Sequence, residues 1–198
     1  MKSGPWRLVF MGTPEFALPS LEALLAAGEE VAAVVTQPDQ GRGRGRKVSP
    51  SPVKELAQAW HLPVMQPTRL RDTEFTARLR EVAPELIIVV AYGRILPPEM
   101  LALPSGGCLN VHASLLPRYR GAAPINWALI RGEKETGVTI QWVQYEVDSG
   151  PIFLQERVPI SAADNFGTMK IDDTDFGNIL DGECRQEDQE QYLCRIPY

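Results

Sequence analysis

The order of apolar segments at the start of the chain is the feature that most restricts its fold. Arg7–Met11 is a short apolar run that ends at Gly12–Glu15, and Phe16–Ala27 then repeats apolar residues at helical spacing. Val31–Thr36 follows as a second buried strand. Strand, helix and strand form a βαβ unit, whose crossover is right-handed in nearly all proteins. The pattern predicts an α/β fold with a mostly parallel central sheet flanked by helices.

The middle of the chain continues this pattern, and its later part departs from it. The continuing segments are two expected helices, Val53–Trp60 and Asp72–Val82, and two expected strands, Leu62–Gln66 and Leu86–Ala91. Thr136–Val143 alternates apolar and polar residues as an antiparallel strand does. Ile152–Val158 is its expected partner strand. We therefore expect one domain over residues 1–169, with an antiparallel portion near its C-terminal end.

Composition and charge indicate a globular protein of the cytoplasm. Hydrophobic residues make up 44% of the chain and charged residues 23%, which is ordinary for a packed domain. Three cysteines far apart in sequence do not form a disulfide framework. We find no apolar run of membrane-spanning length and no secretion signal, so we expect no membrane association. The net charge of −5 is concentrated in residues 170–198, which we expect to form a separate acidic terminus.

Asn110 and His112 form the first candidate site. The run Cys108–His112 alternates as a strand does, so these two side chains point to the same face. Pro117 and Gly121 then end the strand. The pair therefore lies near a carboxyl end, where open α/β sheets bind their ligands.

Two interpretations of this pair remain open. An amide N–H and an imidazole N–H can stabilise the negative oxygen that forms when an amine attacks a carbonyl, and a nearby aspartate would orient the ring. Alternatively, both residues are satisfied polar groups at a strand end, and Asp148 is an ordinary turn residue before Ser149 and Gly150. Covalent acyl transfer is disfavoured because the chain has no Gly-x-Ser-x-Gly motif. A zinc site is disfavoured because no second histidine lies at ligand spacing.

The segment between Thr36 and Pro52 also has two interpretations. It alternates glycine with four cations, Arg42, Arg44, Arg46 and Lys47, against the single carboxylate of Asp39. Such a segment cannot pack a core, and charge runs are usually solvated loops. The same residues can also follow a phosphate backbone and become ordered on contact with it.

Several motifs, in a consistent order, resemble those of the formyltransferases that use 10-formyltetrahydrofolate. These motifs are Asn110–His112, Ser114–Gly121, Ala122–Ile125, Glu135–Thr139 and Asp148–Gly150. Three further segments narrow the resemblance to the methionyl-tRNA branch of that family: Phe10–Ala17, Thr36–Asp39 and Gly43–Lys54. The resemblance runs from about Arg7 to Thr168.

The resemblance implies a Rossmann-like formyltransferase domain and assigns roles to three groups of residues. The implied catalytic residues are Asn110, His112 and Asp148. The implied folate site is lined by Tyr92, Gly93, Arg94, Ile95 and Leu96, and by Ser114, Leu115, Leu116 and Pro117. The implied tRNA contacts, at the acceptor arm, are Arg42, Arg44, Arg46 and Lys47, with Arg44 at the position of the family's functional arginine. We expect 10-formyltetrahydrofolate as the co-substrate and no metal.

The implied activity is transfer of the formyl group of 10-formyltetrahydrofolate to the α-amino group of initiator methionyl-tRNA, for translation initiation in protein biosynthesis. Two alternatives remain: the same transfer to the amine of a sugar nucleotide, and a non-catalytic remnant that binds folate or RNA. We expect a monomer. We also expect the family's C-terminal β-barrel domain to be absent, because 198 residues leave no room for it, and residues 170–198 to be a shortened or atypical terminus.

Overall fold

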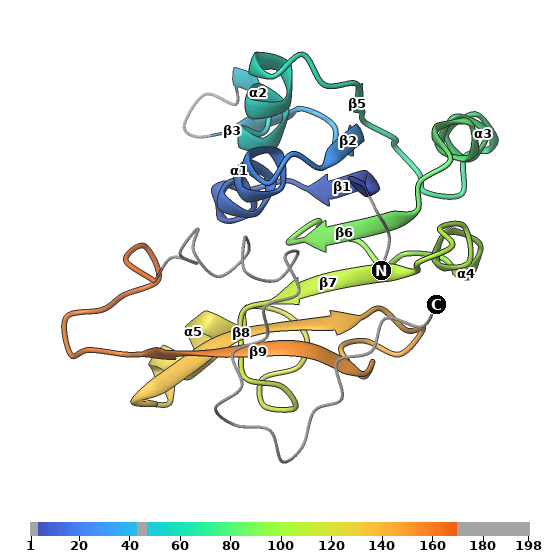
Figure 1. The fold of residues 1–198 in the computed structure, drawn as a ribbon. Helices are drawn as coiled ribbons and strands as arrows, with labels where there is room; N and C mark the ends of the chain where they lie inside the picture. Colours follow the sequence, from blue (N-terminus) through green and yellow to red (C-terminus); the bar gives the residue numbers. More distant parts are fainter. Residues whose placement is uncertain (1–3, 43–46, 170–198) are drawn as a thin grey trace. The chain divides into compact units, whose positions relative to one another are not determined.

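The computed structural model describes residues 4–42 and 47–169 and divides into two compact units (Figure 1). The first unit comprises residues 1–108 and the second residues 109–198. Each unit has its own strands, and they are described in turn.

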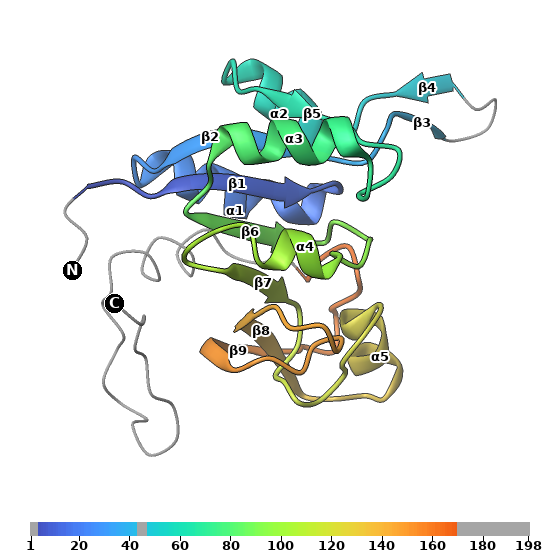
Figure 2. The same cartoon turned by 90° about the vertical axis from the view of Figure 1, so that its right-hand side faces the viewer.

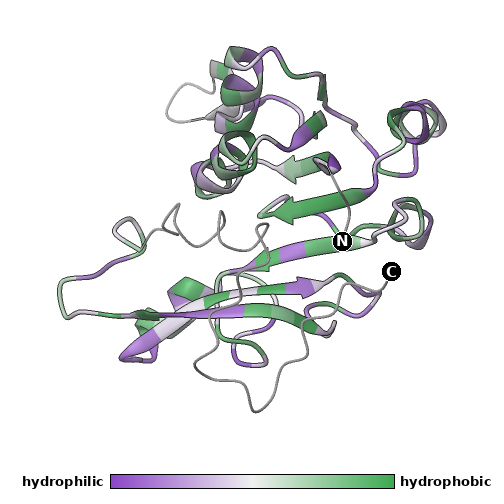
Figure 3. Ribbon diagram, in the orientation of Figure 1, coloured by the Kyte–Doolittle hydropathy of each residue, from purple (hydrophilic) through white to green (hydrophobic). Residues whose placement is uncertain are grey.

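The first unit is built on a parallel sheet. Its strands are β1 (Arg7–Gly12), β2 (Glu30–Val35), β5 (Val64–Met65) and β6 (Leu86–Val90). β1 pairs with both β2 and β6, and β2 pairs with β5, all in parallel, so the order is β5-β2-β1-β6. All five residues of β6 are buried, and Figure 3 shows this strand as apolar along its length. This is the expected pattern for a parallel strand with helices on both faces.

Helices cover both faces of this sheet. They are α1 (Leu18–Ala26), α2 (Pro52–Ala59), α3 (Thr73–Val82) and α4 (Pro98–Leu101). Figures 1 and 2 show α1 and α2 on one face and α3 and α4 on the other. Side chains fix two helix starts: Ser51 accepts the N–H of Lys54 at 3.1 Å, and Asp72 accepts that of Phe75 at 3.0 Å. The predicted α/β architecture is confirmed.

The turn after β1 requires glycine. A Cβ atom at Gly12 would lie 2.8 Å from Phe10 Cε1 and 2.9 Å from Ala17 Cβ, closer than packed carbon atoms approach. The chain then forms a 3₁₀ turn, Glu15–Ala17, before α1 begins. The helix predicted from Phe16 therefore starts at Leu18.

Two short strands lie within the segment between Thr36 and Pro52, where the sequence predicts no regular structure. Gln40–Arg42 (β3) and Lys47–Ser49 (β4) pair in antiparallel register, with Gln40 opposite Ser49 and Arg42 opposite Lys47. The sequence shows no strand pattern here because the strand residues whose burial is described are not buried, so nothing imposes an alternation of apolar residues. Gly41 is exposed, and so is Val48 on the strand opposite.

The second unit is antiparallel, as the alternation near the end of the chain predicts. β7 (Cys108–His112) begins at the boundary between the units, β8 (Glu135–Trp142) pairs with it, and β9 (Ile152–Pro159) pairs with β8. The short helix α5 (Pro124–Ile130) begins with proline, whose backbone angle suits the first helical turn. Among the residues that the structure describes, no helix combines the length and hydropathy needed to cross a bilayer.

Candidate functional site

A row of polar side chains crosses one face of the second unit's sheet. Asn110 on β7 lies directly opposite Gln141 on β8, and His112 lies opposite Thr139. Thr139 lies opposite Gln155 on β9. Directly opposed residues in antiparallel strands project to the same side. The predicted pair therefore belongs to a larger polar surface.

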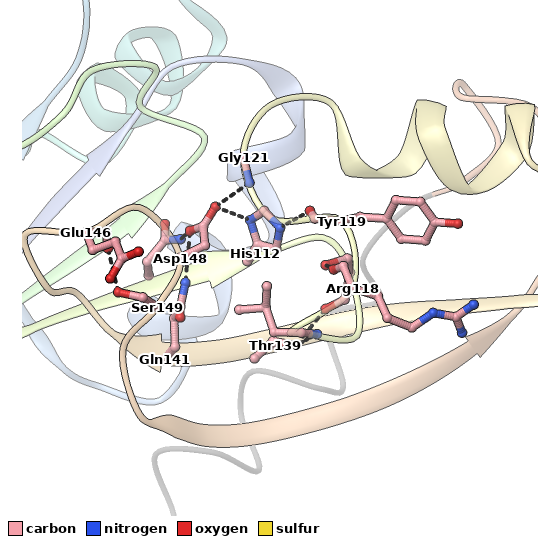
Figure 4. Close-up of polar contacts among 12 residues, drawn as sticks. His112, Arg118, Tyr119, Gly121, Thr139, Gln141, Glu146, Asp148 and Ser149 are labelled. Atoms are coloured by element: carbon pink, nitrogen blue, oxygen red, sulfur yellow. Dashed lines mark hydrogen bonds and ion pairs between the residues drawn. The ribbon is translucent and has the colours of Figure 1, made fainter.

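Asp148 reaches this surface from the turn after β8 (Figure 4). Its Oδ2 accepts the backbone N–H of Gly121 at 2.8 Å, and its Oδ1 accepts Nε2–H of Gln141 at 2.9 Å. Two longer contacts join it to the predicted pair: Asn110 Nδ2 lies 3.4 Å from Oδ1, and His112 Nδ1 lies 3.5 Å from Oδ2. The three residues predicted to be catalytic thus lie together.

The bonding of His112 distinguishes its two ring nitrogens. Nε2 lies 2.9 Å from the carbonyl oxygen of Tyr119. A carbonyl can only accept a hydrogen bond, so we assign a proton to Nε2. The Nδ1 edge faces the Asp148 carboxylate, and the imidazole is only 7% exposed. The Nδ1 edge is therefore the side of the ring that can take part in chemistry with Asp148.

The surroundings of Asp148 suit a carboxylate anion. The side chain is 11% exposed, so little of its charge is solvated by water. Burying a charge is costly unless hydrogen-bond donors replace the lost water. Gly121, Gln141 and Asn110 supply N–H donors to its two oxygens.

The predicted folate segment Ser114–Pro117 is fastened to β8 and β9. The Thr139 hydroxyl accepts the N–H of Leu116 at 3.1 Å and donates to the carbonyl of Ser114 at 2.6 Å. Gln155 Nε2 donates to the Leu116 carbonyl at 2.8 Å. A Cβ atom at Gly137 would lie 2.4 Å from Cδ2 of Leu115, so only glycine leaves room for that side chain. The position of this loop is therefore set by residues of two strands.

The other predicted folate segment, Tyr92–Leu96, lies in the first unit and follows β6. Gln37 Nε2 donates to the Tyr92 carbonyl at 2.9 Å, and Arg94 Nη1 donates to the carbonyls of Pro67 and Thr68 at 3.1 and 2.9 Å. Leu96 is buried, Ile95 is 72% exposed, and Gly93 has φ of +81°. Burial raises the pKa of the Tyr92 hydroxyl, and the Arg94 charge opposes that shift.

The residues predicted to contact tRNA are described only in part. Arg44 and Arg46 lie outside the described residues, and of Arg42 and Lys47 the strand pairing alone is described. At the base of this hairpin, Asp39 accepts hydrogen bonds from Lys54 Nζ and Gln66 Nε2, both at 2.6 Å. These bonds, that of Lys54 first, hold the pKa of Asp39 below its ordinary value.

Two other kinds of chemistry lack support in this part of the chain. Burial raises the pKa of the Cys108 thiol to about 12, so it is not a thiolate nucleophile at neutral pH. Within residues 4–42 and 47–169, no three His, Cys, Asp or Glu side chains are grouped to hold a metal ion.

Sequence reasoning missed the residues that support the site, above all Thr139, Gln141 and Gln155. The alternation of the predicted strand over 136–143 does place positions 137, 139 and 141 on one face. A polar face of this kind is typical of a strand whose one side is solvated, so the alternation alone does not identify Thr139 or Gln141 as supporting residues.

Comparisons with known proteins agree with the resemblance found in the sequence. Residues 6–178 match the family described as formyl transferase. A methionyl-tRNA formyltransferase from Pelotomaculum thermopropionicum is 58% identical over 163 residues, which are 82% of this chain and 52% of the relative. One from Moorella thermoacetica is 62% identical over 154 residues, which are 78% of this chain and 50% of the relative. The chain spans about half the length of these curated relatives.

The fold has solved counterparts. The crystal structure of phosphoribosylglycinamide formyltransferase from Bacillus halodurans is 26% identical and has a TM-score of 0.66, covering 81% of this chain and 84% of that one. Family match, sequence identity and fold agree: the chain belongs to the formyl transferase family.

Proposed function

We propose that this chain transfers the formyl group of 10-formyltetrahydrofolate to the α-amino group of methionyl-tRNA, with residues 1–169 as the catalytic part. The observation that supports this most directly is the meeting of Asn110, His112 and Asp148 on one face of the sheet. The relatives that match at 58% and 62% identity are named methionyl-tRNA formyltransferase.

The predicted folate segment Tyr92–Leu96 offers an apolar contact to a heterocycle. Ile95 is largely exposed, whereas the Tyr92 hydroxyl is buried and has no hydrogen-bond partner among the described residues. Ligand sites commonly combine apolar walls with a few polar groups that fix orientation. In the proposed reaction, 10-formyltetrahydrofolate supplies the formyl group on its N10 atom.

The reaction has a simple balance of bonds and protons. The amine nitrogen of methionyl-tRNA forms a bond to the formyl carbon, and the bond from that carbon to N10 breaks. The proton lost by the amine ends on N10 of the departing tetrahydrofolate. Negative charge gathers on the formyl oxygen during the attack, and this charge is what the site must stabilise.

Two donors can act on that oxygen. A carboxamide has two N–H groups, and in the part of the chain that the structure describes only one of those of Asn110 has a partner. The His112 ring is anchored through Nε2–H and presents its Nδ1 edge. Nδ1 donates to the oxygen in the imidazolium form, in which both ring nitrogens carry protons. The contacts to Asp148, 3.4 Å from Asn110 and 3.5 Å from His112, are long enough to be exchanged for contacts to a substrate oxygen. Asp148 orients the ring and supports removal of the amine proton.

The sequence of the basic segment Arg42–Lys47 supports a nucleic-acid substrate. It contains four cations, Arg42, Arg44, Arg46 and Lys47. Asp39, the carboxylate that precedes them in the sequence, is paired with Lys54 on α2. A string of cations suits a phosphate backbone, whose binding weakens steeply with salt.

Formylation assays with methionyl-tRNA and with an amino-sugar nucleotide, each across a salt series, test this proposal. We expect transfer to methionyl-tRNA, with binding that falls as salt rises, and an Arg44→Ala variant with a shallower salt slope. His112→Ala should lower turnover about 10²-fold or more, the scale of losing such a donor. Transfer only to the sugar nucleotide would overturn the choice of substrate. Saturable folate binding with transfer to neither substrate would show a non-catalytic protein.

A further inference from the structure

Gln141 has the shortest side-chain hydrogen bond to the Asp148 carboxylate. Its Nε2 lies 2.9 Å from Oδ1, against 3.4 Å for Asn110 Nδ2 and 3.5 Å between His112 Nδ1 and Oδ2. Gln141 is 2% exposed and lies on strand β8 rather than in a loop. The amide is therefore well placed to hold the carboxylate still.

The donors around Asp148 fall into two kinds. Gly121 N–H and Gln141 Nε2–H bind one oxygen each at normal hydrogen-bond lengths. Asn110 and His112 make the two long contacts. If the close pair fixes the carboxylate, the long pair stays able to act on a reacting oxygen. We propose that Gln141 is a positioning residue, which fixes the charged Asp148 carboxylate against the Nδ1 edge of His112.

The backbone of Asp148 gives a reason why such a residue is needed. Asp148 lies in a turn with φ of +49°, outside the regular pairing of β8 and β9. Its side chain must therefore be oriented by contacts rather than by strand geometry. Gln141 supplies one such contact from the next-to-last position of β8, directly opposite Asn110.

The oxygen of the Gln141 amide is evidence that the residue does more than stabilise the fold. Its Oε1 is buried and has no hydrogen-bond partner among the described residues. A buried acceptor without a partner destabilises a fold. Stability alone would therefore favour an apolar side chain here, whereas the Nε2 bond to Asp148 explains an amide.

The proposal predicts that the carboxylate is held less firmly when the Gln141 donor is removed. Gly121 N–H would still bind Oδ2, but Oδ1 would keep only the long contact to Asn110. Among the described residues, the titratable group that faces Asp148 is His112 on β7. Removing the Gln141 donor should therefore loosen the placement of the carboxylate against Nδ1 of His112.

The test uses the full chain with two variants and a control. Gln141→Met keeps the side-chain length and removes the donor, and Gln141→Asn keeps the amide but withdraws it by one methylene group. Thr136→Val is the matched control, because Thr136 is buried on the same strand and its hydroxyl has no partner among the residues that the structure describes. Carbon-13 NMR at neutral pH reports the chemical shift and linewidth of the Asp148 carboxyl, with Asp148→Asn to assign its signal.

In Gln141→Met the Asp148 carboxyl signal should move away from its position in the unmodified chain, because the 2.9 Å hydrogen bond is lost. The value of kcat should fall about tenfold, the scale of losing one hydrogen bond, while KM changes by less than about twofold. Gln141→Asn should lie between Gln141→Met and the unmodified chain, and Thr136→Val should match the unmodified chain. Carboxyl signals of Gln141→Met and Gln141→Asn that coincide with that of the control would overturn the proposal.

The catalytic consequence rests on the proposed function, but the NMR measurement does not. An unmodified chain that transfers no formyl group would contradict the proposed function and leave the carboxyl signal as the test of Gln141. An active chain whose Gln141 variants keep the carboxyl signal of the unmodified chain would contradict only the role of Gln141.

Discussion

Thr139 lies opposite His112 across β7 and β8, and its hydroxyl fastens the loop that follows His112. The neighbouring positions on the same face have related tasks. Gly137 leaves room for Leu115, and Gln141 binds Asp148. One face of one strand thus sets both the predicted folate loop and the carboxylate of the candidate catalytic group.

Replacing Thr139 with valine should weaken the fold and the folate site together. The change keeps the side-chain shape but leaves the Leu116 N–H and the Ser114 carbonyl without their buried partner. Such a loss costs about 1–3 kcal/mol. Urea unfolding should show this decrease, and KM for the folate co-substrate should rise more than KM for methionyl-tRNA. Thr136→Val is the control, and equal unfolding free energies for both variants would contradict the role given to the Thr139 hydroxyl.

Several features of this site could be predicted from sequence because they are local. Asn110 and His112 share a face through the two-residue period of a strand, and proline and glycine after them end that strand. Strand β6 could also be predicted from its apolar run, because a strand covered on both faces needs apolar residues throughout.

The supporting residues could not be predicted because their role depends on distant segments. Thr139 and Gln141 lie on the polar face of an alternating strand, which sequence alone assigns to solvent. In the structure, the loop over 114–121 and the turn at Asp148 meet this face and bury it. The periodicity of the strand alone does not show that these distant segments bury its polar face.

The backbone carbonyl of Tyr119 should hold the His112 ring in its orientation. Its carbonyl accepts from Nε2 of His112, and its own φ of +56° is unusual for a residue with a side chain. The hydroxyl donates to Glu133, a bond that raises the pKa of Tyr119 and lowers that of Glu133. The guanidinium of Arg131 lies 5.8 Å from the ring centre. The side chain thus holds the carbonyl in place.

Removing these side-chain contacts should lower turnover in steps. Tyr119→Phe loses one hydrogen bond, and kcat should fall by up to about tenfold. Tyr119→Ala also loses the aromatic ring, and its kcat should fall further. Steady-state kinetics at saturating substrates measures both, with Tyr145→Phe as a control because Tyr145 is largely exposed in the same unit. An unchanged kcat in Tyr119→Ala would show that the His112 ring is held by other contacts.

Asp39 should hold the base of the basic hairpin at neutral pH and release it in acid. The folded-state pKa of Asp39 is held below its ordinary value by hydrogen bonds from Lys54 and Gln66. For a carboxyl group whose pKa is lowered by folding, the contribution to stability is complete above the pKa of the unfolded chain, which is about 4. It is lost as the pH falls through the lower, folded value.

Backbone amide NMR signals of Gln40 and Val48 test this expectation. They should stay constant from neutral pH down to about 4 and shift only below it. Asp39→Asn should show weaker hydrogen-exchange protection of the hairpin already at neutral pH, because the ion pair with Lys54 is gone. Asp164→Asn is the control, since hydrogen bonds from Ser161 and Thr168 also lower the pKa of Asp164, but it lies in the other unit. Hairpin signals that respond equally to both substitutions would mean that Asp39 does not fasten this segment.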